Sequence, residues 1–215
     1  MSEATANIQC LLISACYNRS KILLKDERPV LMKTFIYPEM MVHVPMCTHK
    51  NPRSVLVSSD EAGLLGAELA RYRDVEAVYA PTAQLLNTLR DALDNSADVV
   101  ILDTQCDDAA VLAHLNRVLK NDGLCVLRHR DLDEVEANTK LMQILGNYFK
   151  IIMPYTVGDG TTLLLCSKEY HPTADLILQR SDLLEGQSYY NCDIHTAAFA
   201  MPQYIRKNYL GIIRN

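Results

Sequence analysis

The sequence predicts an α/β protein built on a doubly wound, mostly parallel sheet. From residue 54 onward, short apolar runs alternate with segments of helical periodicity, which is the pattern of βαβ units. The composition agrees, because 49% apolar and 22% charged residues are ordinary for a globular protein. A length of 215 residues suits one full α/β domain with a small appendage. In such sheets, ligands bind beyond the carboxyl ends of the strands.

The apolar runs and helical segments can be placed in order along the chain. Strands are expected at 54–57, 75–79, 98–103, 124–127, 148–154 and 161–167. Helices are expected near 61–72, 82–94, 108–120 and 131–145. The helix at 108–120 should end at the turn residues Asn121, Asp122 and Gly123.

The two ends of the chain follow other patterns. The first 30 or so residues fit two or three short antiparallel strands, and 34–44 has helical spacing with Pro38 in the first turn. The tail, 173–209, predicts two helices joined by the loop 185–192. We therefore expect a small β region with a linking helix at 1–48 and a Rossmann-like domain at 49–215.

Charge and cysteine usage exclude several classes of protein. With 21 basic and 26 acidic residues the formal charge is −5, the opposite of what duplex binding needs, so we expect no nucleic-acid partner. No apolar run is long enough to span a bilayer, and the first ten residues do not resemble a signal peptide. Seven scattered cysteines without a Cys-x-x-Cys pair suggest reduced thiols in a cytoplasmic protein.

Asp103 is the first candidate for chemistry. It stands at the carboxyl end of the most apolar strand, where a carboxylate points into the usual ligand crevice and can act as a base. Asp107 and Asp108 follow in the loop. The alternative is a purely structural role in capping the helix at 108–120, for which Asp107 is well placed.

The turn at 58–66 is the second candidate. It opens the first helix of the α/β domain, where a glycine-rich loop would bind a nucleotide. Only Gly63 and Gly66 are present, and the carboxylates of Asp60 and Glu61 would repel a phosphate. An ordinary capped helix is the favoured interpretation, and phosphate-bearing cofactors are disfavoured.

The histidines favour structural roles. In the tail, Asp193 is expected to cap a helix, Phe199 to anchor it to the core, and His195 to make structural hydrogen bonds. His43 and His49 flank an expected turn at 45–48 and are assigned to a surface loop. No spacing of His, Cys and carboxylates predicts a metal site.

Four segments together are similar to the polyamine aminopropyltransferases, the spermidine synthases. The likeness extends over residues 35 to 208. Its carriers are FIYPEMMVHVPMCTHKNPRSVLV (35–57), ADVVILDTQCDD (97–108), MPYTVGDGTTLLLCSK (153–168) and YYNCDIHTAAFAMPQYI (189–205).

This resemblance implies a fold and a reaction. The fold would be a small N-terminal β domain followed by a methyltransferase-like Rossmann domain, in a cytoplasmic homodimer. The reaction would move an aminopropyl group from decarboxylated S-adenosylmethionine to putrescine, giving spermidine and methylthioadenosine. The nucleoside would be a co-substrate, so no permanently bound cofactor is expected.

The resemblance also assigns residues on the amine side of the site. Asp103 matches the presumed general base, and Tyr37 would assist the deprotonation. Asp107, Tyr155 and Glu39 would bind substrate. The second aspartate of the family's D-x-x-D loop is absent, because Cys106 stands at that position and Asp107 comes one residue late. Pro38 likewise replaces a His or Gln.

The adenosyl side departs further from the family. Gly63, Asp60 and Thr82 would line the nucleoside pocket. The family's GGGDGG becomes SSDEAG here, the ribose-binding Glu is replaced in the stretch around Thr82, and the stretch before residue 97 is shortened. These losses leave an alternative open, a catalytically inactive homologue that acts as a binding or interaction protein. A methyltransferase that uses intact S-adenosylmethionine is a third, weaker hypothesis.

Overall fold

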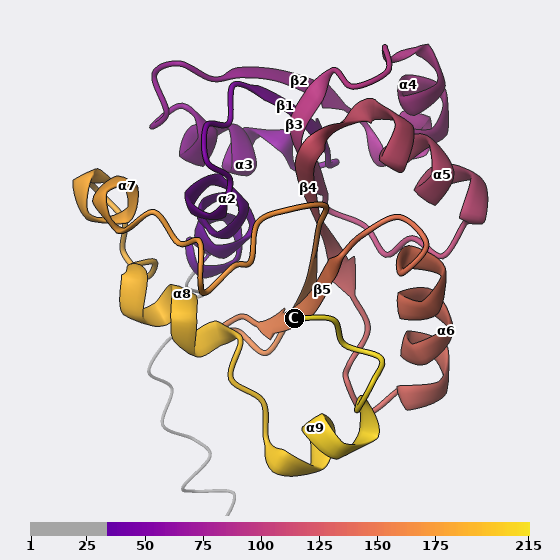
Figure 1. Cartoon of the computed structure of the whole chain (residues 1–215). Coiled ribbons are helices and arrows are strands. Elements are labelled where there is room, and N and C mark those ends of the chain that lie inside the picture. The colour runs from indigo at the N-terminus through magenta and orange to yellow at the C-terminus, as the bar shows by residue number, and fades with distance from the viewer. Residues whose placement is uncertain (1–33) are drawn as a thin grey trace, which may run out of the picture. The chain divides into compact units, whose positions relative to one another are not determined.

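A six-stranded sheet organises residues 34–215, the part of the chain that the computed structural model describes (Figure 1). The strand order is β2-β1-β3-β4-β6-β5. The strands are β1 (Ser54–Ser58), β2 (Glu76–Ala80), β3 (Ala97–Leu102), β4 (Leu119–His129), β5 (Ile151–Thr156) and β6 (Thr162–Ser167). The pairings among β2, β1, β3 and β4 are parallel, and β6 runs antiparallel to both β4 and β5. The predicted α/β class with a mostly parallel sheet is confirmed.

Helices cover both faces of this sheet (Figure 1). They are α2 (Ile36–Thr48), α3 (Ala62–Leu69), η1 (Thr82–Gln84), α4 (Leu85–Asp91), α5 (Ala109–Val118), α6 (Val135–Leu145), α7 (Leu178–Leu183), α8 (Cys192–Ala198) and α9 (Gln203–Asn208). One core cluster joins the sheet to α4, α5, α6 and α9, and the other joins it to α2, α3 and α8. Successive side chains of a strand point to opposite faces, so Val99 and Ile101 pack toward α2 while Val100 and Leu102 pack toward α5. This two-sided burial explains why β3 is apolar at nearly every position.

Two expectations at α5 are corrected. Helix α5 ends at Val118, before the predicted turn, and residues 119–123 belong to strand β4. In the β3–β4 register, Ala97 pairs with Leu119 and Val99 with Leu124, so the extra residues of β4 form an excursion within the strand. A Cβ at Gly123 would lie 3.1 Å from the backbone N and O of Lys120, which explains the glycine there. The cap of α5 is Asp108, whose carboxylate accepts from the N–H of Ala110, and not Asp107.

The tail also differs from expectation, because it holds three short helices instead of two. Pro202 separates α8 from α9. The cap of α8 is Asn191, whose side-chain oxygen accepts from the N–H of Ile194, so the prediction for Asp193 was wrong. Phe199 does anchor this segment, since it is buried and packs against the ring of Tyr155 at a centroid distance of 5.0 Å.

His43 and His49 are buried, so their assignment to a surface loop was wrong. His43 lies inside α2, which continues through Pro45, and His49 caps its C-terminal end. A proline inside a helix costs about 3 kcal/mol. Burial offsets that cost here, because 12 of the 13 residues of α2 are buried between the sheet and neighbouring helices. His195 makes structural hydrogen bonds as expected, to the hydroxyl of Tyr190 and to the carbonyl of Pro172.

The remaining expectations about organisation have different outcomes. The strands predicted in the first 30 residues lie outside the described residues, and the domain division at residue 48 stays a prediction. Between residues 34 and 215, no helix combines the length and apolar character that crossing a bilayer requires.

Two buried histidines predict a loss of stability in acid. Burial lowers the pKa of His129 and of His195 to about 4, against an ordinary value of 6.5. Between these values the unfolded chain binds protons that the folded chain excludes, so stability is complete above pH 6.5 and declines toward pH 4. We expect a loss of ~3 kcal/mol in the free energy of unfolding for each residue, measured by urea unfolding at pH 7 and pH 4.

His129→Leu separates the two contributions. Neither ring nitrogen of His129 has a hydrogen-bond partner within residues 34–215, so leucine removes a desolvated polar ring without breaking a contact. Between pH 7 and pH 4 the variant should lose ~3 kcal/mol less of its free energy of unfolding than the wild type. The control is His114→Gln on the partly exposed part of α5. An unchanged pH dependence in His129→Leu would contradict the assignment.

Candidate functional site

Asp103 lies at the carboxyl edge of the parallel strands, as the sequence predicts. It follows β3 directly, and its backbone N–H donates to the carbonyl of Ser58 at 2.8 Å. Ser58 is the last residue of β1, the neighbour of β3 in the sheet. This bond fixes where the chain leaves β3 and therefore where the Asp103 side chain begins.

The carboxylate of Asp103 is held by two hydroxyl groups. The hydroxyl of Tyr37 donates to Oδ1 at 2.5 Å, and that of Ser59 donates to Oδ2 at 2.8 Å. The guanidinium of Arg128 lies 4.0 Å from Oδ1. The Asp103 side chain is 14% exposed, so it is oriented by its neighbours and still reachable from solvent. An oriented, accessible carboxylate can accept a proton from a bound substrate.

Tyr37 reaches Asp103 from the first turn of α2. Burial and the hydrogen bond to Asp103 both raise the pKa of Tyr37 well above its usual value. The phenol therefore keeps its proton and acts as a donor. The charge of Asp159 also raises the pKa of Tyr37. The charge of Arg128, whose Cζ lies 5.6 Å from the centroid of the Tyr37 ring, lowers it.

The predicted adenosyl residues Asp60 and Thr82 are in contact. Asp60 accepts from the N–H of Thr82 at 3.0 Å and from its hydroxyl at 2.6 Å, and these bonds lower the pKa of Asp60. The loop after β1 is thereby tied to the segment after β2. Gly63 lies in the first turn of α3, and a Cβ there would meet nothing within 4 Å, so space is open in front of it. Ser59 stiffens the same loop by accepting from the N–H of Glu61.

Asp107 is engaged in an ion pair with Arg130. Both carboxylate oxygens accept from the guanidinium, one of them at 2.9 Å, and this partner lowers the pKa of Asp107. Arg130 also lies 3.8 Å from Glu134. Substrate binding by Asp107 stays a prediction, and it would require exchange of this exposed ion pair.

Glu39 and Tyr155 are enclosed by the chain itself. Glu39 is 1% exposed, and its two oxygens accept from the backbone N–H groups of Ser188, Tyr189 and Tyr190 at 2.7–2.8 Å. The hydroxyl of Tyr155 is buried and donates to the carbonyl of Met40 at 3.3 Å. Their substrate-binding roles stay predictions, and contact with a ligand would require these bonds to open. In this structure both residues fasten α2, one to the tail and one to β5.

The comparisons with known proteins agree on one family. The model of the spermine/spermidine synthase domain matches residues 34–104, which extends from α2 to just beyond Asp103. A polyamine aminopropyltransferase of a Thermoanaerobacter species is 28% identical over 92% of this chain and 87% of its own length. The Helicobacter acinonychis enzyme of the same name is 26% identical over 83% of this chain and 79% of its own length. The chain is thus similar to the polyamine aminopropyltransferases over most of its length.

Solved structures agree with the fold of this chain. A spermidine synthase in complex with the transition-state analogue AdoDATO superposes with a TM-score of 0.72 at 21% identity, covering 83% of this chain and 76% of that one. The Thermotoga maritima spermidine synthase gives a TM-score of 0.71 at 22% identity, covering 83% and 75%. At these identities the likeness to the solved structures shows the fold.

Two residues beside Asp103 were missed by the sequence analysis. Ser59 follows β1, and Arg128 is the penultimate residue of β4. The strand-end rule that selected Asp103 applies equally to both positions. Serine and arginine at the edge of a sheet are common, however, and only the contacts of the folded chain distinguish them.

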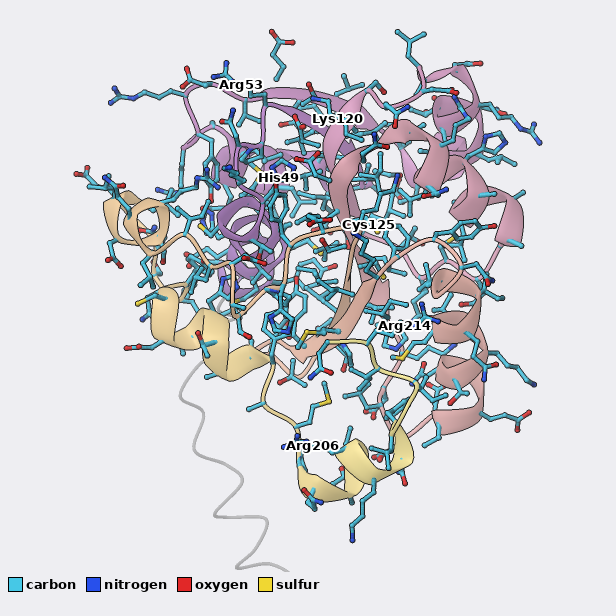
Figure 2. All side chains as sticks on the ribbon, in the orientation of Figure 1. His49, Arg53, Lys120, Cys125, Arg206 and Arg214 are labelled. Atoms are coloured by element: carbon cyan, nitrogen blue, oxygen red, sulfur yellow. The ribbon has the colours of Figure 1, made fainter. Side chains whose placement is uncertain are left out.

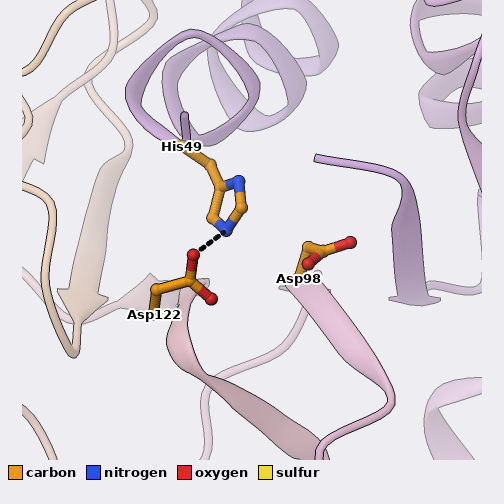
Figure 3. A group of neighbouring side chains, drawn as sticks. All are labelled: His49, Asp98 and Asp122. Carbon is orange, nitrogen blue, oxygen red and sulfur yellow. Dashed lines mark ion pairs between the residues drawn. The ribbon is translucent and has the colours of Figure 1, made fainter. Parts of the chain in front are cut away.

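A second cluster of ionisable side chains lies at the opposite, amino end of β3. It consists of His49, Asp98 and Asp122, with Lys120 beside them (Figures 2 and 3). Asp98 accepts from the N–H groups of residues 53 and 54 through one oxygen and pairs with Lys120 at 2.8 Å through the other. Nε2 of His49 points to Asp122 across 3.8 Å.

The tautomer of His49 argues against a metal ion in this cluster. Nδ1 of His49 accepts a hydrogen bond from the N–H of Asn51, so the ring proton is on Nε2. Metal ligation by Nε2 would require the lone pair at that atom. Lys120 already supplies positive charge to Asp98. We assign the cluster a structural role and call it the amino-end latch.

The contacts of Glu39 predict that it stabilises the fold. Glu39→Gln replaces one accepting oxygen by an NH₂ group that faces backbone donors. We expect a loss of ~3 kcal/mol in the free energy of unfolding, measured by urea denaturation. Glu136→Gln is the matched control, because Glu136 is 85% exposed and, within residues 34–215, pairs only with Lys140. If the two variants have equal free energies of unfolding, the hydrogen bonds from residues 188–190 to Glu39 do not stabilise the fold.

Proposed function

We propose that this protein transfers an aminopropyl group from decarboxylated S-adenosylmethionine to putrescine, producing spermidine and methylthioadenosine. The observation that supports this most directly is the Asp103 carboxylate, oriented by Tyr37 and Ser59 at the carboxyl edge of the sheet. Similarity to the polyamine aminopropyltransferases supports the reaction class, and the AdoDATO complex of a structural relative supports the choice of co-substrate.

The proposed reaction needs a base and a fixed geometry. The amine of putrescine is protonated at neutral pH and must lose a proton before it attacks. In our proposal Asp103 accepts that proton, and the amine nitrogen then attacks the carbon adjacent to the sulfonium. The new N–C bond forms as the C–S bond breaks, and the electron pair of that bond remains on the sulfur of methylthioadenosine. Holding the reactants in line supplies much of the rate enhancement.

Tyr37 and Ser59 would assist as orienting donors. Each holds one oxygen of Asp103, so the carboxylate keeps one direction while the amine approaches. Because Tyr37 retains its proton, it does not compete with Asp103 for the proton of the amine. The negative charges of Asp103 and Asp159 favour the cationic sulfonium in the same region.

The adenosyl group would bind along the loop after β1. Asp60, Thr82 and Gly63 border it, and the co-substrate would leave as product instead of remaining bound. The absent ribose-binding carboxylate costs about 1.5–3 kcal/mol, since hydrogen bonds to charged groups fall in that range. This corresponds to roughly a tenfold to hundredfold weaker nucleoside affinity. A high KM for decarboxylated S-adenosylmethionine follows from the proposal.

By the same resemblance we propose a cytoplasmic homodimer with small-molecule substrates. Sedimentation equilibrium of the full chain tests the dimer, and a monomer at micromolar concentration would contradict it.

Asp103→Asn tests the assignment of the base. The amide cannot accept the proton, so methylthioadenosine formation should fall by about 10²–10⁴-fold. Tyr37→Phe should lower the rate less, because Ser59 still orients the carboxylate. Release of methylthioadenosine is followed by chromatography with putrescine and decarboxylated S-adenosylmethionine as substrates.

Asp133→Asn, an exposed substitution of the same kind on the loop before α6, is the control and should keep the wild-type rate. No product at high enzyme concentration, or an unaffected Asp103→Asn variant, would refute the proposed reaction. Calorimetric titration with methylthioadenosine measures nucleoside binding separately from turnover.

A further inference from the structure

The turn after β5 brings another carboxylate to the edge of the sheet that carries the proposed base. Strand β5 runs parallel to β3 and β4, because β6 is antiparallel to both β4 and β5. Thr162, the first residue of β6, pairs with His129 at the end of β4 on one side and with Thr156 at the end of β5 on the other. The turn 157–161 therefore lies at the carboxyl edge, with Asp159 at its centre.

Hydrogen bonds within the turn fix the direction of the Asp159 side chain. The N–H of Val157 donates to the carbonyl of Thr161 at 2.8 Å, and the N–H of Gly160 donates to the carbonyl of Val157 at 2.9 Å. The N–H of Thr161 donates to Oδ1 of Asp159, also at 2.8 Å. Gly160 has a φ of 91°, and a Cβ there would meet nothing within 4 Å. The space beside this neighbour of Asp159 is therefore open.

The other side of the turn rests on Tyr189. A Cβ at Gly158 would collide with the hydroxyl of Tyr189, so the two residues are in close contact. Tyr189 belongs to the segment whose N–H groups Glu39 binds, and this segment thus holds both α2 and the turn. The charge of Asp159 raises the pKa of Tyr37, as a carboxylate near the phenol does.

Asp159 differs from Asp103 and Asp107 because no cation compensates its charge. Asp103 has the guanidinium of Arg128 at 4.0 Å, and Asp107 is paired with Arg130. Within residues 34–215, no basic side chain forms an ion pair with Asp159, and its Oδ2 accepts no hydrogen bond. The two ion pairs leave one free negative charge at this edge, and that charge attracts a cation.

A diamine brings two cationic nitrogens, and the proposed reaction uses one of them. When Asp103 has accepted the proton of the attacking amine, the amine at the other end of the molecule is still protonated. In the sheet order, β4 alone separates β3 from β6, so the chain after β3 and the turn before β6 are two strand spacings of about 4.8 Å apart. A four-carbon diamine with a hydrogen bond of about 2.9 Å at each end is long enough to bridge them.

We propose that Asp159 is a specificity-determining residue that binds the second ammonium group of the acceptor, so that the site prefers a diamine to a monoamine of the same length. The proposal rests on the aminopropyl transfer proposed above and names the residue that selects its acceptor. Because Asp159 does not deprotonate the attacking amine, it acts on KM more than on kcat.

The test compares putrescine with 1-aminobutane, which has the same four-carbon chain and a single amine. Asp159→Asn removes the charge and keeps an oxygen that can accept from the N–H of Thr161, so the turn is preserved. We expect the KM for putrescine to rise about tenfold or more with little change in kcat, and the kinetics with 1-aminobutane to stay the same. Asp159→Glu keeps the charge and should retain part of the preference for putrescine.

Asp74→Asn is the matched control. It removes the same charge from an exposed position just before β2, at the opposite, amino edge of the sheet, and should leave both acceptors unchanged. If the ratio of kcat/KM for the two amines is the same in wild type and Asp159→Asn, the proposal is overturned. An equal change of this ratio in Asp74→Asn would overturn it as well, because the effect would then come from net charge.

Absence of turnover with both acceptors in the wild type would instead refute aminopropyl transfer. Calorimetric titration of putrescine in the presence of methylthioadenosine measures the role of Asp159 without turnover. The proposal requires binding of putrescine to be about tenfold weaker in Asp159→Asn, with no change for 1-aminobutane. Equal dissociation constants for putrescine, or no binding of putrescine by the wild type, would refute it.

Discussion

One buried carboxylate fixes the geometry on which the candidate site depends. Glu39 accepts from three consecutive backbone N–H groups at residues 188–190, and so joins α2 to a segment about 150 residues later in the chain. Two residues before it on the same helix, Tyr37 meets Asp103. The tail therefore sets the depth of α2 against the sheet, and that depth sets the distance between the phenol and the carboxylate. A helix held at one point by charge and at another by packing cannot rotate without breaking both.

The sequence predicts the part of the site that depends on strand ends. Asp103 was selected because parallel strands deliver the residues after them to one edge, and the structure brings Tyr37 to it as the resemblance implies. Glu39 shows the limit of that reasoning. Its partners are backbone N–H groups far along the chain. No local pattern distinguishes a carboxylate that binds substrate from one that accepts hydrogen bonds from the backbone of a loop.

The errors in secondary structure have a common cause. Pro45 and the Asn121–Gly123 run are turn signals, and local propensity places breaks there. Burial of α2 on nearly all sides overrides the proline. In β4 the pairing with β3 is interrupted at the asparagine and glycine and resumes at Leu124, so the strand continues after a local excursion. In both places tertiary contacts outweigh a local preference of a few kcal/mol, and such contacts are not visible in a window of ten residues. The third helix of the tail has a different cause, because Pro202 separates α8 from α9 where the prediction had one helix.

The two ends of β3 each carry an aspartate, but the groups that bind the two carboxylates differ. At one end of β3, Asp98 is bound by two backbone N–H groups and an ammonium. At the other, Asp103 is bound by two side-chain hydroxyls, those of Tyr37 and Ser59. Main-chain donors thus hold the carboxylate at the amino end of β3, whereas side-chain donors hold the carboxylate that follows its carboxyl end.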